Sequence, residues 1–304
     1  MAVYDFCMFF NENDIYEIRL NQYWDFVDKF IVVEAGETHT GFKKSFNFDL
    51  ERFKKFQSKI VYIKFDSFEE EMANYPYLDC RIGRMVHGNH YDWARDHFQA
   101  NYIVKVLKDI QADPKDIILV SSADEIVSRE GFNEALSLFN NEKTFVGYHS
   151  QHNGTIIEGI RPMFGFHMYM YVYKFNLLRF KDIVVGMITE VGNFDKVLPA
   201  TARSLSLTTH PHIKNGGWHL TYMDSGDGDK VMLKHHSWAH ARDPGGIDGK
   251  RRIDTATKEE SLELLYKEHP VTEVPIAIGT HPEYIVNNVD KFKNYIYNKE
   301  KGTI

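Results

Sequence analysis

The sequence predicts an α/β fold, with a Rossmann-like parallel sheet in the N-terminal half and a smaller mixed sheet in the C-terminal half. Up to residue 126, short apolar runs alternate with helical patterns, as in a parallel sheet with crossover helices. Ile117–Val120 is a continuous apolar run, which suits a strand buried on both faces. After residue 126, aromatic-rich apolar stretches are separated by glycine and proline, which favours a mixed sheet packed on the first.

The N-terminal half begins with an apolar strand at Val3–Phe10, which is broken by Asn11. Asp14, followed three residues later by Glu17, resembles a capping box and predicts the start of a helix. The next predicted elements are a strand at Phe30–Val33, a short helix at Leu50–Phe56 and a strand at Ile60–Phe65.

The most regular helix is predicted at Asp92–Leu107, because Ala94, Phe98 and Tyr102 repeat at four-residue spacing. The strand at Ile117–Val120 follows it. No Gly-x-Gly-x-x-Gly motif follows any of these strands, which argues against an NAD enzyme.

The C-terminal half is predicted to contain more strands than helices. The strands are Phe145–Tyr148, Met170–Phe175, Val184–Ile188 and Trp218–Met223, and the helices are Thr257–Lys267 and Asp290–Tyr297. No linker separates the halves, so we expect one continuous domain over residues 1–304.

The composition is that of an ordinary globular protein, with 43% hydrophobic and 26% charged residues among 304. A net charge of -7 argues against nonspecific nucleic-acid binding. Two cysteines exclude a disulfide framework and a cysteine-rich zinc site, and Cys7 is expected to be a small core residue. The sequence shows neither a transmembrane run nor a secretory signal, so we expect a cytoplasmic protein.

A carboxylate pair, Asp124 and Glu125, follows the strand at Ile117–Val120. In open α/β sheets, ligands bind beyond the carboxyl ends of the strands. Two adjacent carboxylates there suit Mg²⁺ or Mn²⁺, which commonly carries a phosphorylated ligand. The alternative is a solvated loop, or a cap for a helix that starts near Ser128.

The late histidines and the tryptophans form a second group of candidates. His236 and His240 have the spacing of one helix face, but the pattern lacks the glutamate of a zincin motif. His219 or His240 could serve as a further metal ligand or contact a phosphate. The tryptophans are expected in the core, except Trp218, which stands beside His219 and is a candidate sugar platform.

Three arginines could meet a diphosphate through bidentate hydrogen bonds. Arg81 and Arg84 lie in the long segment between residues 66 and 91, and Arg95 lies in the helix that follows. For each one, a role as an ordinary surface charge is the alternative.

Four blocks of sequence carry a resemblance to a known family. They are Tyr4–Leu20, Val27–Ala35 with Thr38–Gly41, Trp93–Gln99 with Asp116–Ile126, and Gly216–His219 with Ser237–His240. In these blocks, and in their order, the chain resembles glycosyltransferase family 17, the family of the β-1,4-mannosyl-glycoprotein 4-β-N-acetylglucosaminyltransferase.

The resemblance implies a GT-A-like fold and an inverting transferase that uses a UDP-sugar and Mn²⁺ or Mg²⁺. It divides the single domain into a nucleotide-sugar-binding half, 1–126, and an acceptor half, 127–304. Asp124 and Glu125 fall on the acidic motif of the family, in which Ser122 replaces the first aspartate. We therefore expect Asp124, Glu125 and His240 to bind the metal.

The expected reaction moves a sugar, GlcNAc for preference, from UDP to a hydroxyl of a glycan or glycoconjugate. Donor contacts are expected from Asn11, Glu34, Arg84, Arg95, Trp218 and His219. The acceptor needs a base on the opposite face of the sugar, and Asp224, Glu190 and Asp227 are the candidates. The alternatives are a nucleotide-sugar-binding protein without turnover and a nucleotide-sugar hydrolase.

Overall fold

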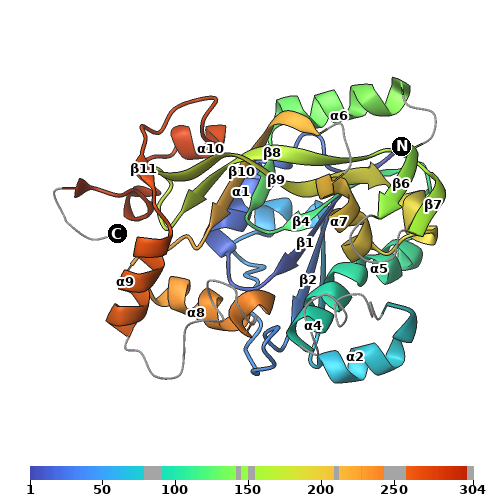
Figure 1. Ribbon diagram of the computed structural model, residues 1–304, viewed down its shortest axis with the longest axis horizontal. Coiled ribbons are helices and arrows are strands. Elements are labelled where there is room, and N and C mark those ends of the chain that lie inside the picture. The colour runs from blue at the N-terminus through green and yellow to red at the C-terminus, as the bar shows by residue number, and fades with distance from the viewer. Residues whose placement is uncertain are drawn as a thin grey trace.

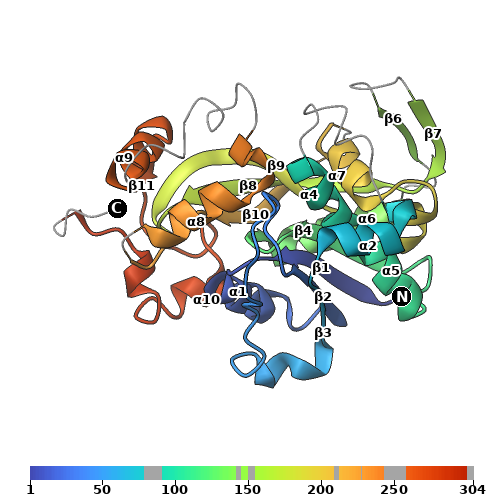
Figure 2. The same cartoon turned by 90° about the horizontal axis from the view of Figure 1, so that it is seen from below.

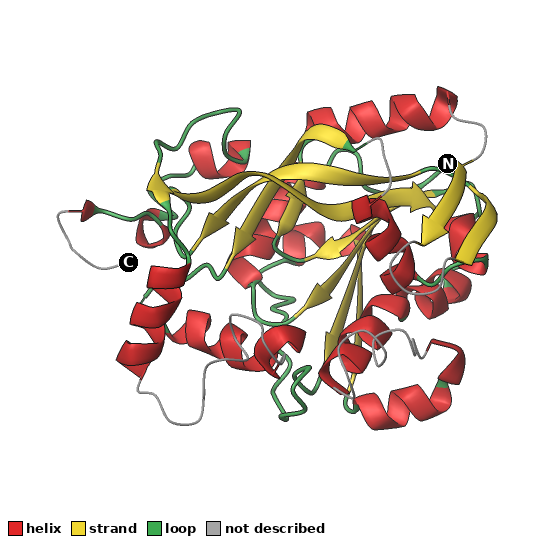
Figure 3. Ribbon diagram, in the orientation of Figure 1, coloured by secondary structure: helices red, strands yellow, loops and turns green. Residues whose placement is uncertain are grey.

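The structure is a computed structural model that describes residues 1–78, 91–141, 145–149, 155–208, 212–226, 228–242 and 258–299. In these ranges the chain forms a mixed α/β fold, in which helices pack on both faces of a nine-stranded sheet (Figures 1 and 3). The sheet order is β3-β2-β1-β4-β9-β8-β10-β5, and β11 pairs with β9. None of the helices in these ranges is long and apolar enough to cross a membrane.

The N-terminal half confirms the predicted parallel sheet. Its strands, all parallel to one another, are β1 (Val3–Phe9), β2 (Lys29–Ala35), β3 (Ile60–Phe65) and β4 (Ile117–Ser122). In β4, Ile117 and Leu119 belong to the core on one face, and Ile118 and Val120 belong to the core on the other. Burial on both faces explains why the run is continuously apolar.

Helices cover the two faces of the sheet (Figure 2). One face packs against α1 (Asn13–Tyr23), α6 (Arg129–Asn141) and α10 (Glu283–Val286). The opposite face packs against α2 (Phe68–Asn74), α4 (Tyr91–Asn101), α5 (Ile103–Asp109) and α7 (Pro199–Thr208). Cys7 is fully buried in the first core, as predicted.

The C-terminal strands do not form a second sheet packed on the first, and this part of the prediction is wrong. β9 (Leu177–Glu190) pairs antiparallel with β4, and β8 (Met163–Val172), β10 (Ile213–Thr221) and β5 (Glu125–Val127) continue the same sheet. β11 (Thr272–Glu273) lies beside β9, and only β6 (Phe145–His149) and β7 (Thr155–Ile160) stand apart among the described strands. Apolar periodicity shows which faces are buried, but it does not show which edges pair.

Several helices differ from their predicted form. The helix predicted at Asp92–Leu107 is divided at Tyr102 into α4 and α5. The predicted capping box does not form, since α1 has Glu12 at its N-cap and no side-chain cap. The remaining helices are η1 (Lys54–Lys59), η2 (Pro76–Leu78), η3 (Val191–Asp195), α8 (Asp229–Ser237), η4 (Ala239–Arg242), α9 (Lys258–Glu268) and η5 (Lys293–Tyr295). Of these, α9 was predicted nearly at its bounds, whereas η1 and η5 are 3₁₀ turns where short helices were expected.

Candidate active site

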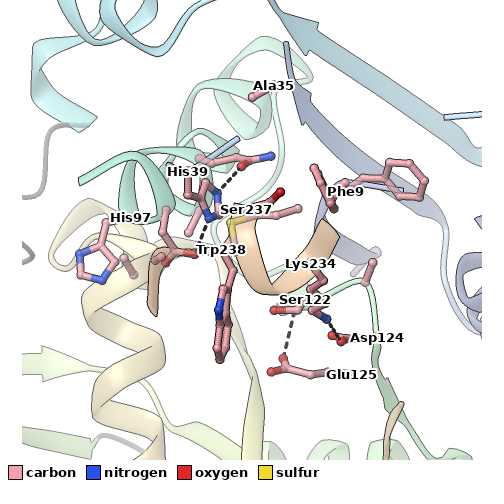
Figure 4. Close-up of a pocket in the computed structure, with 18 of the residues that line it drawn as sticks. Phe9, Ala35, His39, His97, Ser122, Asp124, Glu125, Lys234, Ser237 and Trp238 are labelled. Atoms are coloured by element: carbon pink, nitrogen blue, oxygen red, sulfur yellow. Dashed lines mark hydrogen bonds and ion pairs between the residues drawn. The ribbon is translucent and has the colours of Figure 1, made fainter. Parts of the chain in front are cut away.

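A cavity of about 580 Å³ lies at the carboxyl ends of β1, β2 and β4 (Figure 4). Parallel strands bring these ends to one edge of the sheet, where ligands of open α/β sheets bind. The volume falls in the roughly 300–1,000 Å³ range of small-molecule sites. The lining includes Phe9 and Glu12 at the end of β1 and after it, Glu37 and His39 after β2, Ser122, Asp124 and Glu125 at the end of β4 and after it, and Trp93, Asp96, His97 and Gln99 from α4.

The other wall of the cavity comes from the C-terminal half. On α7, Ala200, Arg203, Ser204 and Leu207 line it at helical spacing and so share one face of that helix. Lys234 of α8 and His219 of β10 lie on the same wall, with Trp238 between α8 and η4.

Asp124 is held in a buried ion pair at the cavity floor. Lys234 Nζ donates to Asp124 Oδ2 at 2.5 Å and to Thr221 Oγ1 at 3.2 Å, and His219 Nε2 lies 3.6 Å from Asp124 Oδ2. Burial opposes ionisation of Asp124, but Lys234 and His219 outweigh it and hold the pKa of Asp124 well below its usual range. The carboxylate is therefore ionised throughout the physiological pH range.

Glu125 forms a second ion pair beside the first. Its carboxylate accepts hydrogen bonds from Arg203 Nη2 and, at 3.0 Å, from the Ser122 backbone N–H. Glu125 is also the residue that pairs with His219 between β5 and β10. The two acidic residues of the motif are thus each matched to a basic side chain from the C-terminal half.

Buried Arg19 shapes the loop that carries these carboxylates. Its guanidinium forms a fork with Asp5, at 2.5 and 2.8 Å. It also donates to the carbonyls of Ser122 at 2.8 Å and Glu125 at 2.7 Å, and to the Ser121 hydroxyl at 2.7 Å. One side chain of α1 therefore fixes both ends of the turn after β4.

His39 and Asp96 form a second polar group that lines the cavity. His39 Nδ1 lies 3.5 Å from Asp96 Oδ1, and His39 Nε2 lies 2.8 Å from Gln99 Oε1. Gln99 Nε2 donates to the Val33 carbonyl at 2.9 Å, so its Oε1 faces the histidine and accepts from His39 Nε2–H. Nδ1 is then the basic atom of the neutral ring, and it faces a carboxylate.

The described side chains at this site do not fit the expected Mn²⁺ or Mg²⁺. Within the described ranges, no group of three or more His, Cys, Asp or Glu side chains could hold a metal ion. The Lys234 ammonium already stands at 2.5 Å from the Asp124 oxygen that a cation would bind. Glu125 is likewise occupied by Arg203 and by the Ser122 N–H.

Among the residues predicted to bind the metal or the donor, Asp124, Glu125 and His219 line the cavity. Four of the predicted donor contacts do not line it, namely Asn11, Glu34, Arg95 and Trp218. Glu34 is fully buried away from it, and its carboxylate accepts from Lys44, Tyr62 and the backbone N–H groups of residues 47 and 48. The Glu34 carboxylate therefore supports the loop after β2.

The other three predicted donor contacts have structural partners. Trp218 packs in the core on the face of the sheet that α1, α6 and α10 cover, rather than serving as a sugar platform. Arg95 Nη1 donates to the His39 carbonyl at 3.0 Å and supports the turn before Gly41. Asn11 lies beside a smaller neighbouring cavity.

The two predicted bases that the structure describes are also placed elsewhere. Glu190 is opposite Ile117 in the register of β9 and β4, which puts it at the other end of β4 from Asp124, and it pairs with Arg161. Asp224 accepts from the backbone N–H groups of Gly226 and Gly228, so it shapes the turn before α8. Neither carboxylate lines the cavity.

Several candidates lie outside the described part of the chain. They are Arg81, Arg84 and Asp227, together with the side chain of His240. The backbone does settle one point, since α8 ends at Ser237 and Trp238 is extended. His236 and His240 therefore do not share a helix face.

Sequence reasoning missed several residues that line the cavity. These are His39, Asp96, Gln99, Lys234, Arg203, Trp93 and Trp238. His39, Asp96 and Trp238 lay inside the blocks of the resemblance without a role. For Arg203 the available signal was Pro199 at the first position of a helix, which would have predicted α7.

Two comparisons with known proteins bear on the identity of this fold. A search of curated proteins found no match. The sequence model of glycosyltransferase family 17 matches residues 1–139, which span β1 to β4 and the residues that follow each strand at the cavity. The chain therefore carries a glycosyltransferase family 17 domain over residues 1–139, which makes it a transferase enzyme.

Proposed function

We propose that the cavity binds a UDP-sugar, with GlcNAc as the preferred sugar, and that the enzyme transfers this sugar to a glycan hydroxyl with inversion. The observation that carries the proposal is the overlap of two findings. The family 17 match runs from the first residue into α6, and the cavity lies at the carboxyl ends of the parallel strands inside that match. The GT-A-like assignment and the inverting course are part of this proposal.

The lining of the cavity suits a nucleotide sugar. Trp93 and Trp238 offer aromatic faces for a nucleobase or a sugar ring, while basic and acidic side chains lie on the floor. Such a mixture, in which apolar walls surround a few placed polar groups, is the usual composition of a small-molecule site.

We assign the acceptor base to His39, which Gln99 orients and Asp96 faces. In a single displacement, the acceptor oxygen forms a bond to the anomeric carbon as the bond from that carbon to the diphosphate breaks. The acceptor proton goes to His39 Nδ1, and the departing UDP keeps the electron pair. Asp96 Oδ1, 3.5 Å from the same nitrogen, stabilises the imidazolium that forms by its negative charge, while Gln99 holds the opposite nitrogen, Nε2, at 2.8 Å.

The test is UDP release from a panel of UDP-sugars, measured with and without candidate glycan acceptors. We expect one donor to be turned over faster when an acceptor is present, with the sugar recovered on the acceptor. Release that no acceptor accelerates would instead indicate a hydrolase, and binding without release would indicate a nucleotide-sugar-binding protein.

The base assignment is tested by His39→Gln and Asp96→Asn. Both variants should bind UDP as the wild type does, because neither side chain is placed on the diphosphate. Transfer should fall by roughly 10²–10⁴-fold in His39→Gln, the usual contribution of a general base. Wild-type transfer by this variant would remove His39 from the mechanism.

A further inference from the structure

The two carboxylates of the acidic motif lie behind the basic side chains that pair with them. The side chains of Asp124 and Glu125 are each 3% exposed, whereas those of Lys234 and Arg203 are 19% and 23% exposed. All four line the cavity, so a ligand that enters it meets the two cations first. Figure 4 shows the Lys234 side chain pointing to Asp124, with a dashed line between the two.

Lys234 is held in place and still has capacity to bind. An ammonium group has three N–H donors, and the contacts with Asp124 and Thr221 use two of them. Burial disfavours the charge of Lys234, but Asp124 and then Glu12 outweigh it and raise the pKa of Lys234 above its usual value. The side chain is therefore a permanent cation with one donor left for a ligand oxygen.

Arg203 adds a second cation with spare donors. The guanidinium has five N–H donors, and its contact with Glu125 is made through Nη2. It comes from the cavity face of α7, while Lys234 comes from α8, so the two cations approach the floor from different elements.

We propose that Lys234, assisted by Arg203, binds the diphosphate of the donor and neutralises the charge of the departing UDP, so that sugar transfer by this enzyme does not need a divalent metal. The inference rests on the proposed function and names the groups that perform one part of it. Asp124 then acts as the anchor that positions Lys234, and not as a metal ligand. Fixed cations aimed at a developing negative charge are the electrostatic help that such a leaving group requires.

The first experiment compares donor turnover and UDP binding in EDTA with the same measurements in Mn²⁺. We expect the turnover rates of the wild type to agree within about twofold in the two conditions, and calorimetry to show UDP binding in EDTA. Turnover that appears only with Mn²⁺ would overturn the inference and leave the proposed function standing. Failure to bind or turn over any UDP-sugar in either condition would refute the proposed function and this inference with it.

The second experiment uses Lys234→Met, with Lys230→Met as the matched control. Lys230 lies one turn earlier on α8 and also pairs with a carboxylate, Asp14 at 3.2 Å, but it does not line the large cavity. Lys234→Met should weaken UDP binding in EDTA and lower donor turnover by roughly 10²–10³-fold, the usual loss when one such donor is removed. Lys230→Met should leave both unchanged.

Two further variants protect this test from a folding defect. Lys234→Met leaves Asp124 buried without its cation, whereas the double variant with Asp124→Asn removes both charges. We expect the double variant to fold, as judged by circular dichroism, and still to lose UDP binding. Lys234→Arg should retain most of the binding. UDP binding at the wild-type level in the folded double variant would overturn the assignment of Lys234.

Discussion

Arg19→Met should destabilise the protein more than any exposed arginine substitution can. The guanidinium is fully buried and is bonded to the Asp5 carboxylate, to two backbone carbonyls and to a hydroxyl. Methionine fills much of the same volume but supplies none of these donors. The change therefore leaves a buried carboxylate without its cation.

The magnitude follows from these contacts. Removing one partner of a buried ion pair costs about 3–5 kcal/mol, because the other charge stays buried and uncompensated. The lost hydrogen bonds to the carbonyls of Ser122 and Glu125 add about 1 kcal/mol. We expect a loss of about 4–6 kcal/mol in the free energy of unfolding, a large part of the roughly 5–15 kcal/mol that a domain has.

Urea denaturation followed by circular dichroism measures this loss, and Arg52→Met is the matched control. Arg52 also meets two carboxylates, Asp14 and Glu17, but its side chain is 29% exposed, so its loss should cost only about 0–1 kcal/mol. The double variant with Asp5→Leu removes both charges and should be more stable than Arg19→Met alone. Equal losses in Arg19→Met and Arg52→Met would refute the reasoning.

Two further predictions concern the strands at the cavity. Gly217→Ala should abolish folding or UDP binding, because Gly217 has φ +144° and an added Cβ would lie 2.0 Å from the Ile126 carbonyl oxygen. The control is Gly226→Ala, whose added Cβ would meet nothing within 4 Å. This control should match the wild type in thermal unfolding. The free energy of unfolding of Asp124→Asn should be lower than that of the wild type at pH 7, and this gap between the two proteins should be constant down to about pH 5. Since the folded-state pKa of Asp124 is lowered, its contribution is present above the unfolded-state value of about 3.9 and is lost below it, so the gap should narrow by roughly 1.4 kcal/mol per pH unit as the pH falls further. A gap in urea midpoints that stays constant to pH 3 would contradict this assignment.

The local pattern of the sequence is sufficient to predict the parallel half of the fold and the edge at which the cavity lies. The apolar runs of β1, β2 and β4 require burial on both faces, and only a sheet covered on both sides provides it. The polar residues that follow such strands then meet at one edge. For this reason Asp124 and Glu125 could be predicted as cavity residues, while the pairing of β9 with the edge of β4 could not.

The same local pattern misleads where a loop close by in the chain uses the carboxylate of a polar residue. Glu34 stands near the end of β2 and Asp224 follows β10, as site residues do, but each carboxylate is used to satisfy backbone N–H groups of a nearby loop. A buried carboxylate must be hydrogen-bonded, and the sequence does not show whether a loop or a ligand supplies the donors.

By itself the sequence determined the α/β class, the parallel strands and the acidic pair at the end of β4. Only the tertiary structure decided what that pair does, because its partners come from other elements. Lys234 is 110 residues from Asp124 in the chain, and Arg203 is 78 residues from Glu125. Periodicity reports which face of each helix is buried, whereas the packing of α7 and α8 over the edge of the sheet determines which cations reach the carboxylates. The residue types of the acidic motif alone suggested a metal site. In the folded chain, its two carboxylates hold two basic side chains toward the cavity.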